Sequence, residues 1–107
     1  MTSEVLSSRF STAADRIPHW PELCGPVTGV VVLPNRLCWS GPADFDVTDL
    51  AERLTLYTLL MSCGQRADLA AYINGALLRH DWPNVKRLTT RDLTSVWEER
   101  LPQLTRT

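Results

Sequence analysis

The side chains that could bind a metal ion are scattered along the chain. They are His19, Cys24, Cys38, Cys63 and His80. Zinc sites are usually recognised by local ligand pairs such as CxxC or HxxxH, and neither pair occurs in this sequence. An isolated cysteine more often packs as a small apolar side chain. We therefore expect neither a metal ion nor a cofactor.

Nucleophilic catalysis would require a serine or cysteine close to a base and an orienting acid. The sequence contains none of the motifs GxSxG, HExxH, GxxxxGKS and GxGxxG. His80 and Asp81 are neighbours on an expected helix, where successive side chains point about 100° apart, so we expect no dyad between them. The sequence therefore predicts a protein that is not an enzyme.

Basic side chains are concentrated in residues 79–91, RHDWPNVKRLTTR, against a single acid, Asp81. They are Arg79, Lys86, Arg87 and Arg91. Residues 44–52, DFDVTDLAE, are in contrast strongly acidic. A basic patch of this kind can follow phosphates or face an acidic partner, although such runs are also common on solvated helix faces. The charge is therefore polarised along the chain.

A helix-turn-helix over residues 66–91 is an alternative interpretation of this basic region. If Gly75 is the turn glycine, Ala71 occupies the small position that the motif requires, but Asp81 falls at a buried position and does not fit. With a formal net charge of −1, the chain also lacks the general excess of basic residues that is typical of a nucleic-acid binder. The motif is degenerate, and a DNA-binding transcriptional regulator is the alternative function.

The length of 107 residues and the hydrophobic content of 44% predict one domain with a modest core. An odd number of cysteines, without a signal peptide or a membrane-spanning run, is typical of a reduced, cytoplasmic protein that makes no membrane contact. Residues 1–26 are rich in Ser, Thr and Pro, and we expect them to form a flexible N-terminal extension. Residues 27–107 are expected to form a single small helical domain.

The predicted fold is mainly α, a cluster of about four short helices that follows a short extended or β segment. Residues 27–34 favour a strand or an irregular hairpin because they contain three consecutive valines. The first helix is expected to begin after Asp49, with Glu52 completing a capping box, and to end at Gly64. Its apolar stripe is Leu50, Leu54, Tyr57 and Met61.

Three shorter helices are predicted to follow. The first covers residues 66–73, and the second begins after an Asn74 N-cap, covers residues 75–82 and is closed by Pro83. The third is capped by Thr89 or Thr90. Trp82 and Trp97 are expected in the core of this cluster. Trp20 and Trp39 lie beside prolines outside the helices, and for them core and interface positions both stay open.

Residues 33–88 resemble a known family in several quoted stretches. LPNRLCWSGP, FDVTDLAERLTLY and LLRHDWPNVKRL resemble the pattern LPxxLxWSGP, FDLxDxxERxxxY and xxLLxxxWPxL. This pattern is similar to that of small actinobacterial antitoxins paired with MenT-type (AbiEii-like) nucleotidyltransferase toxins. The resemblance implies a non-enzymatic protein that binds and restrains a cognate toxin, either alone or as a homodimer.

The predicted partner-binding residues fall into two groups. The first is the loop from Arg36 to Phe45, in which Trp39 is a residue type enriched at binding hot spots. The second is a charged surface formed by Arg79, Lys86, Arg87 and Arg91. Together with these residues, the resemblance implies an antitoxin-like module whose basic surface occupies the nucleotide- or RNA-binding groove of a toxin, in a toxin–antitoxin system.

Overall fold

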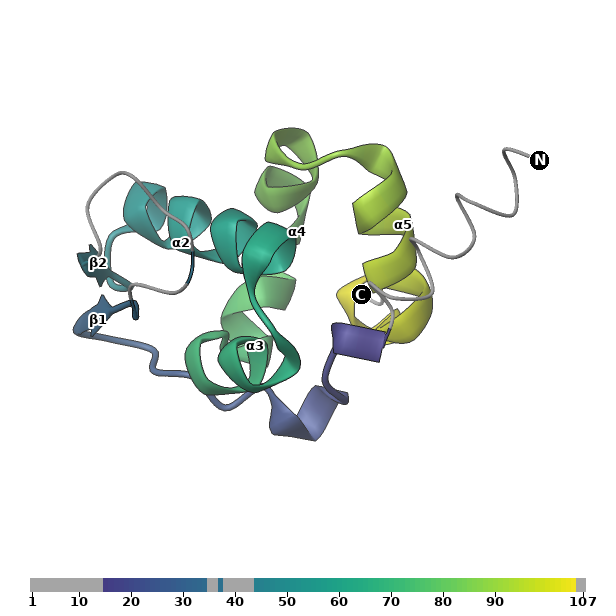
Figure 1. Cartoon of the computed structure of the whole chain (residues 1–107). Helices are drawn as coiled ribbons and strands as arrows, with labels where there is room; N and C mark the ends of the chain where they lie inside the picture. Colours follow the sequence, from purple (N-terminus) through teal and green to yellow (C-terminus); the bar gives the residue numbers. More distant parts are fainter. Residues whose placement is uncertain (1–14, 35–36, 38–43, 106–107) are drawn as a thin grey trace.

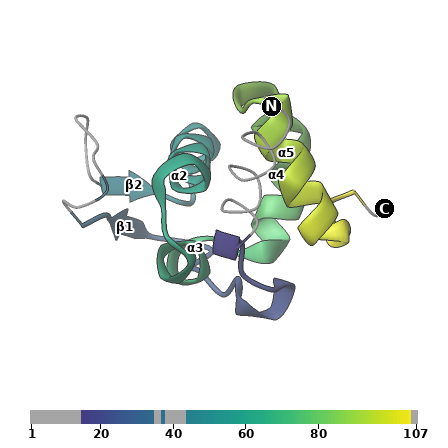
Figure 2. The ribbon, with the colours of Figure 1, turned by 45° about the vertical axis from the view of Figure 1, so that its right-hand side comes forward.

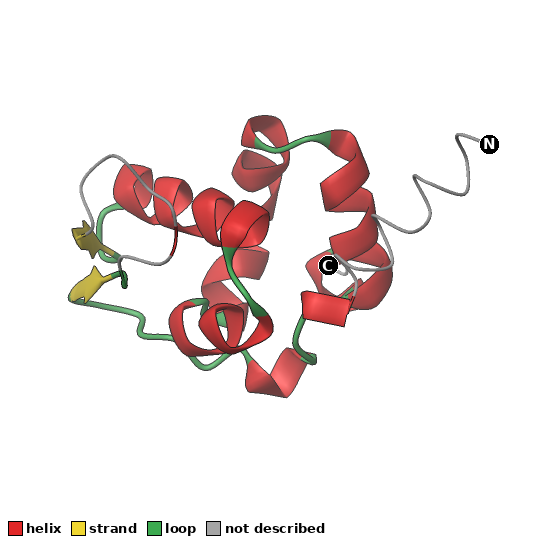
Figure 3. Ribbon diagram, in the orientation of Figure 1, coloured by secondary structure: helices red, strands yellow, loops and turns green. Residues whose placement is uncertain are grey.

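The computed structural model describes residues 15–34, 37 and 44–105, and within them the chain is mainly helical (Figure 1, Figure 3). Two short strands precede four α-helices, which confirms the predicted fold class. The elements in chain order are η1 (Trp20–Glu22), β1 (Val30–Val32), β2 (Asp44–Asp46), α2 (Leu50–Cys63), α3 (Arg66–Tyr72), α4 (Gly75–Leu88), α5 (Arg91–Arg100) and η3 (Pro102–Leu104).

The two strands form a small antiparallel sheet at one end of the molecule, beside α2 (Figure 2). Val31 lies opposite Phe45, and both side chains are buried in the core. Successive strand residues point to opposite faces, so Val30 and Val32 face outward and are 64% and 66% exposed. The sheet therefore contributes to the core through one face only.

Helix α2 begins where the sequence predicts, after Asp49. The Asp49 side chain accepts a hydrogen bond from the Glu52 backbone N–H at 3.0 Å. Glu52, however, accepts from the backbone N–H of Asp46 rather than from that of Asp49, so the predicted reciprocal capping box does not close. Gly64 ends the helix with a φ of −74°, in the extended region, and not with the left-handed conformation that favours glycine.

The predicted apolar stripe of α2 is correct except at its first position. Tyr57 and Met61 are fully buried and Leu54 packs partly against the core, but Leu50 is 45% exposed. Arg53 is buried in the first turn instead, because its guanidinium is paired inside the protein. The inward face of this turn is thus polar.

Helix α4 continues through Pro83 to Leu88, so the predicted end at Trp82 is wrong. A proline inside a helix has no N–H for the carbonyl four residues earlier, and this usually bends or ends the helix. Pro83 lies on the exposed face of α4, whereas Leu78, Trp82 and Val85 are buried on the opposite face. Packing of this apolar face offsets the lost hydrogen bond and carries the helix past the proline.

Residues 15–26 are part of the packed domain, and the predicted flexible extension is wrong for them; residues 1–14 lie outside the described residues. Ile17 and Leu23 are 2% and 4% exposed in the core. A polar, proline-containing composition indicated disorder, but these two apolar side chains are placed where they can pack. The domain therefore begins well before residue 27.

The segment around Cys24 is held by the junction between α3 and α4. Cys24 forms an isolated β-bridge with Asn74, in which the Gly25 N–H donates to the Ile73 carbonyl and the Gly75 N–H donates to the Leu23 carbonyl, both at 3.0 Å. Asn74 also caps α4 by accepting from the Leu77 N–H at 3.1 Å. One junction thus fixes both the N-terminal segment and the start of α4.

The core extends from the sheet through α2 to the C-terminal helix. Trp82 and Trp97 are 3% and 1% exposed, which confirms their predicted core positions. Trp20 packs against the core while part of its ring stays accessible. Trp39 lies outside the described residues. Among the residues that the structure describes, no helix has both the length and the apolar character needed to cross a bilayer.

Candidate functional site

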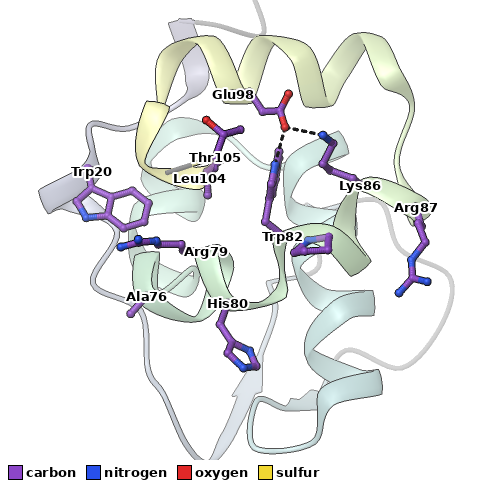
Figure 4. A pocket seen from close by; sticks show the side chains of 11 residues that line it. Trp20, Ala76, Arg79, His80, Trp82, Lys86, Arg87, Glu98, Leu104 and Thr105 are labelled. Atoms are coloured by element: carbon purple, nitrogen blue, oxygen red, sulfur yellow. Dashed lines mark hydrogen bonds and ion pairs between the residues drawn. The ribbon is translucent and has the colours of Figure 1, made fainter. Parts of the chain in front are cut away.

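An open groove of about 1110 Å³ lies between α4 and the C-terminal α5–η3 segment (Figure 4). Helix α4 forms its floor, and Trp20, Glu98 and Leu104 contribute from η1, α5 and η3. Small-molecule pockets in proteins usually have volumes of roughly 300–1,000 Å³ and enclose most of their ligand. The groove lies just above this range and is open to solvent, so it can also accept a segment of another macromolecule.

Three of the predicted basic residues line this groove. Arg79, Lys86 and Arg87 all project from α4, while Arg91 begins α5 and borders a separate hollow of about 410 Å³ that Lys86 also lines. The structure therefore brings together three of the four predicted cations, and Arg91 lies beside them rather than among them.

The predicted loop surface is not part of this site. Arg36 and Trp39 lie outside the described residues. Phe45 is 5% exposed and lies opposite Val31 in the sheet, so its predicted role as a partner contact is wrong. The alternation of β2 turns Phe45 toward the core and leaves Asp44 on its exposed face. A buried phenylalanine is unavailable to a partner.

Glu98 connects α5 to the floor of the groove on α4. Its Oε2 accepts hydrogen bonds from Lys86 Nζ at 2.7 Å and from the Trp82 indole Nε1–H at 2.9 Å (Figure 4). The hydrogen bond from Lys86, and next the one from Trp82, hold the pKa of Glu98 below its usual range. Glu98 therefore carries a negative charge at neutral pH and fixes α5 against α4, while Lys86 keeps 46% of its side chain exposed.

A second ionic link lies inside the protein, where α4 packs against α2. The Asp81 carboxylate accepts from Arg53 Nε at 2.6 Å and from Nη2 at 3.1 Å, and Arg53 Nη1 donates to the Val47 carbonyl at 2.8 Å. Burial alone would raise the pKa of Asp81, but the hydrogen bonds from Arg53 and His80 outweigh it and lower that pKa. The hydrogen bond to Asp81 in turn raises the pKa of Arg53. Both groups are charged, and they hold the groove helix in place.

His80 contacts this buried pair from the groove side, contrary to the prediction that His80 and Asp81 would not meet. Its Nδ1 lies 2.9 Å from Asp81 Oδ1. The 100° separation on the helix fixes only the directions of the two Cβ atoms, and the longer His80 side chain reaches back to its neighbour. The carboxylate can only accept, so Nδ1 carries the proton of this contact. Because Asp81 already binds Arg53 through both oxygens, the pair is a structural link.

The segment 66–91 differs from the predicted helix-turn-helix at its turn. Helices α3 and α4 are joined by Ile73 and Asn74, and Gly75 is the first residue of α4. Among the glycines that the structure describes, Gly29 alone has a positive φ, so the assignment of Gly75 as the turn glycine is wrong. The objection based on Asp81 is also wrong, because Asp81 is fully buried through its pairing with Arg53.

Comparisons with known proteins identify no relative of this chain. No protein-family model, no curated protein and no solved structure matches it. Over the ranges 15–34, 37 and 44–105, no group of three or more His, Cys, Asp or Glu side chains is arranged to hold a metal ion. The groove on α4 is the feature whose chemistry bears most directly on function.

Proposed function

We propose that this chain is a non-enzymatic protein-binding module and that the groove on α4 binds an acidic surface of its partner. The observation that carries the proposal is that Arg79, Lys86 and Arg87 all line, from α4, one groove that also contains the partly accessible Trp20. Cationic side chains around an accessible aromatic ring are typical of protein interfaces, where Arg and Trp are enriched and charge complementarity sets partner choice.

The resemblance of residues 33–88 to short antitoxins supports a particular class of partner, a nucleotidyltransferase-type toxin. The catalytic centre of such an enzyme is acidic because it holds metal ions, and a basic groove matches it in charge. In this proposal the α4 surface covers the nucleotide- or RNA-binding groove of the toxin. The protein thus neutralises the toxin by direct binding, alone or as a homodimer.

Co-expression with the product of the adjacent gene tests the proposal. We expect the two proteins to co-purify, and the complex to lose the nucleotidyltransferase activity of the isolated toxin. The triple variant Arg79→Glu, Lys86→Glu, Arg87→Glu should release the partner while keeping its circular dichroism spectrum. Arg100→Glu, at the exposed C-terminal end of α5, is the matched charge-reversal control. Absence of a complex with the folded wild-type chain would refute this function.

The alternative, a DNA-binding regulator, makes a different prediction about salt. A protein that contacts several phosphates loses affinity by orders of magnitude between roughly 50 and 200 mM salt. Fluorescence anisotropy with labelled promoter DNA measures this dependence directly. Tight, strongly salt-dependent binding to that DNA, together with no complex with the adjacent gene product, would favour the regulator.

A further inference from the structure

The exposed face of α4 carries three pairs of residues, each separated by seven positions. These pairs are Ala76 and Pro83, Arg79 and Lys86, and His80 and Arg87. Seven residues make almost two complete turns of an α-helix, so the members of each pair lie above one another, about 10.5 Å apart along the axis. All six residues are exposed and line the groove. The face therefore consists of three rows parallel to the helix axis.

The order of these rows follows from helix geometry. A step of four residues turns the helix by about 40°, so Arg79, Pro83 and Arg87 lie on three adjacent rows. The apolar row of Ala76 and Pro83 is thus in the middle, with a basic row on each side. One flanking row holds Arg79 and Lys86, on the side of Trp20 and Glu98, and the other holds His80 and Arg87 (Figure 4).

The surroundings of the groove extend this pattern. The Trp20 ring lies over the first residue of α4, since a Cβ added to Gly75 would be 3.3 Å from the ring. The Arg79 side chain extends toward Trp20, and Lys86 reaches toward Glu98 (Figure 4). Apolar surface is therefore accessible along the centre of the groove and at its Trp20 end, and positive charge borders it.

We infer that this face of α4 binds an acidic amphipathic helix of the partner protein. In packed helix pairs, apolar residues repeat along a central seam, and charged residues on either side of it select the partner. A helix with an apolar seam and glutamates in both flanking rows, repeating every seven residues, complements the α4 rows in spacing and in charge. The inference rests on the proposed protein-binding function and specifies the chemistry of its ligand.

The apolar middle row favours a protein ligand over a nucleic acid. A phosphate backbone would pair with the flanking cations but has no apolar side chain to cover Ala76 and Pro83. A helix offers both kinds of contact at once, and the small Ala76 side chain allows its close approach. Charge complementarity together with this central apolar row identifies the occupant as a peptide helix.

Glu98 is a built-in competitor for such a ligand. Its carboxylate Oε2 lies 2.7 Å from Lys86 Nζ. A glutamate of the partner helix must therefore share Lys86 with Glu98 or displace Glu98 from it. Glu98→Gln removes the charge and keeps an oxygen that can accept from Trp82. We expect this variant to bind an acidic helix up to about fivefold more tightly, the range of a partly exposed ion pair.

Designed peptides provide the decisive probe. The first has about three heptads with leucine along the seam and glutamate in the flanking positions, the second is its sequence-scrambled control, and the third carries lysine in place of glutamate. Titration of each peptide into the full-length chain at about 150 mM salt, by isothermal calorimetry, measures the affinities. We expect the glutamate peptide to bind, and the affinities of the other two peptides to be at least tenfold lower.

Charge reversal on the protein locates the site. The double variant Arg79→Glu, Lys86→Glu should lower the affinity for the glutamate peptide at least tenfold and should bind the lysine peptide. Arg100→Glu should change neither affinity. Equal binding of the ordered and scrambled peptides, or affinities unchanged by the α4 reversal in a folded variant, would overturn the inference. So would a duplex DNA, or a second copy of this chain, that occupies α4 in preference to the glutamate peptide.

The outcomes for the inference and for the proposed function are separable. If the glutamate peptide binds α4 but the adjacent gene product does not co-purify, the helix site stands and the antitoxin function fails. If the toxin co-purifies and Arg79→Glu with Lys86→Glu leaves that complex intact, toxin binding stands, but the α4 groove is not the surface that binds it and the helix site fails.

Discussion

Arg53 on α2 and Asp81 on α4 form a bidentate ion pair in the interior, with N–O distances of 2.6 and 3.1 Å. Asp81 is fully buried, and Arg53 is 8% exposed. The third guanidinium nitrogen donates to the Val47 carbonyl just after β2. This pair fixes the groove helix to the rest of the domain.

Removal of one member of the pair should be severely destabilising. In Asp81→Asn the Arg53 charge stays buried without its counter-charge, and such losses cost about 3–5 kcal/mol of unfolding free energy. Urea denaturation followed by circular dichroism measures this. The double variant Arg53→Met, Asp81→Leu replaces both charges with apolar side chains and should recover most of the loss.

The exposed ion pair between Arg66 and Glu22 is the matched control. Its N–O distance is also 2.6 Å, but the side chains are 41% and 42% exposed. Glu22→Gln should therefore lower the unfolding free energy far less than Asp81→Asn does, because solvent screens an exposed ion pair. Similar losses in Asp81→Asn and Glu22→Gln would show that the interior pair contributes no more than a surface contact.

Stability should fall in acid because of Asp81. Its pKa is lower in the folded protein than the ordinary value of 3.8, so the unfolded chain binds a proton more readily than the folded one. The stabilisation is fully present above the unfolded-state pKa and is lost as the pH falls through the folded-state pKa. Unfolding free energies between about pH 7 and pH 2 should show this loss, with a shallower acid slope in Arg53→Met, Asp81→Leu. An unchanged slope would contradict the assignment.

Glu98 should matter more for stability than Lys86, although the two form one ion pair. Glu98→Ala leaves the buried Trp82 indole N–H without its acceptor, and an unsatisfied buried donor costs about 1–3 kcal/mol. Lys86→Ala removes only a partly exposed cation and should cost less than about 1 kcal/mol. Thermal and urea unfolding of both variants tests this order, and a larger effect of Lys86→Ala would contradict it.

Gly25→Ala should weaken the attachment of the N-terminal segment. A Cβ at this position would lie 2.4 Å from the Tyr72 carbonyl carbon and oxygen, so the two backbones would have to separate. Such overpacking typically costs about 1–3 kcal/mol. The exposed Thr28→Ala should stay within about 0.5 kcal/mol of the wild type. If Gly25→Ala were equally neutral, the segment would not be closely packed against α3.

Helix starts were predictable because their signals are local. Asp49, Asn74 and Thr90 each accept a hydrogen bond from the backbone N–H three residues later, as the sequence indicates for Asp49 and Asn74 and for one of two threonines. The ends were less predictable. Pro83 is a local signal for termination, but tertiary packing of the α4 apolar face overrides it.

The buried pair and the groove depend on contacts between distant segments. Arg53 falls within the apolar stripe of α2, and Asp81 falls between Leu78 and Val85 on α4. Oppositely charged residues at core positions of two helices indicate that a buried ion pair is possible. The sequence does not show which helices pack together, so the pair itself could not be predicted. Glu98 and Trp20 gave no local signal, because their positions in the groove depend on how α5 and η1 pack.

Asn74 bonds to two further segments, α2 and the N-terminal segment, in addition to capping α4. Its backbone N–H donates to the Tyr57 hydroxyl at 3.2 Å, and its side-chain Nδ2 donates to the Gly25 carbonyl at 3.0 Å. The first turn of α4 therefore cannot fray without also loosening the N-terminal segment that carries Trp20. These parts form one cooperative opening unit, whose amides exchange with solvent together. A ligand in the groove should accordingly slow hydrogen exchange at Gly25 and Gly75, whose N–H groups bond to backbone carbonyls at the junction.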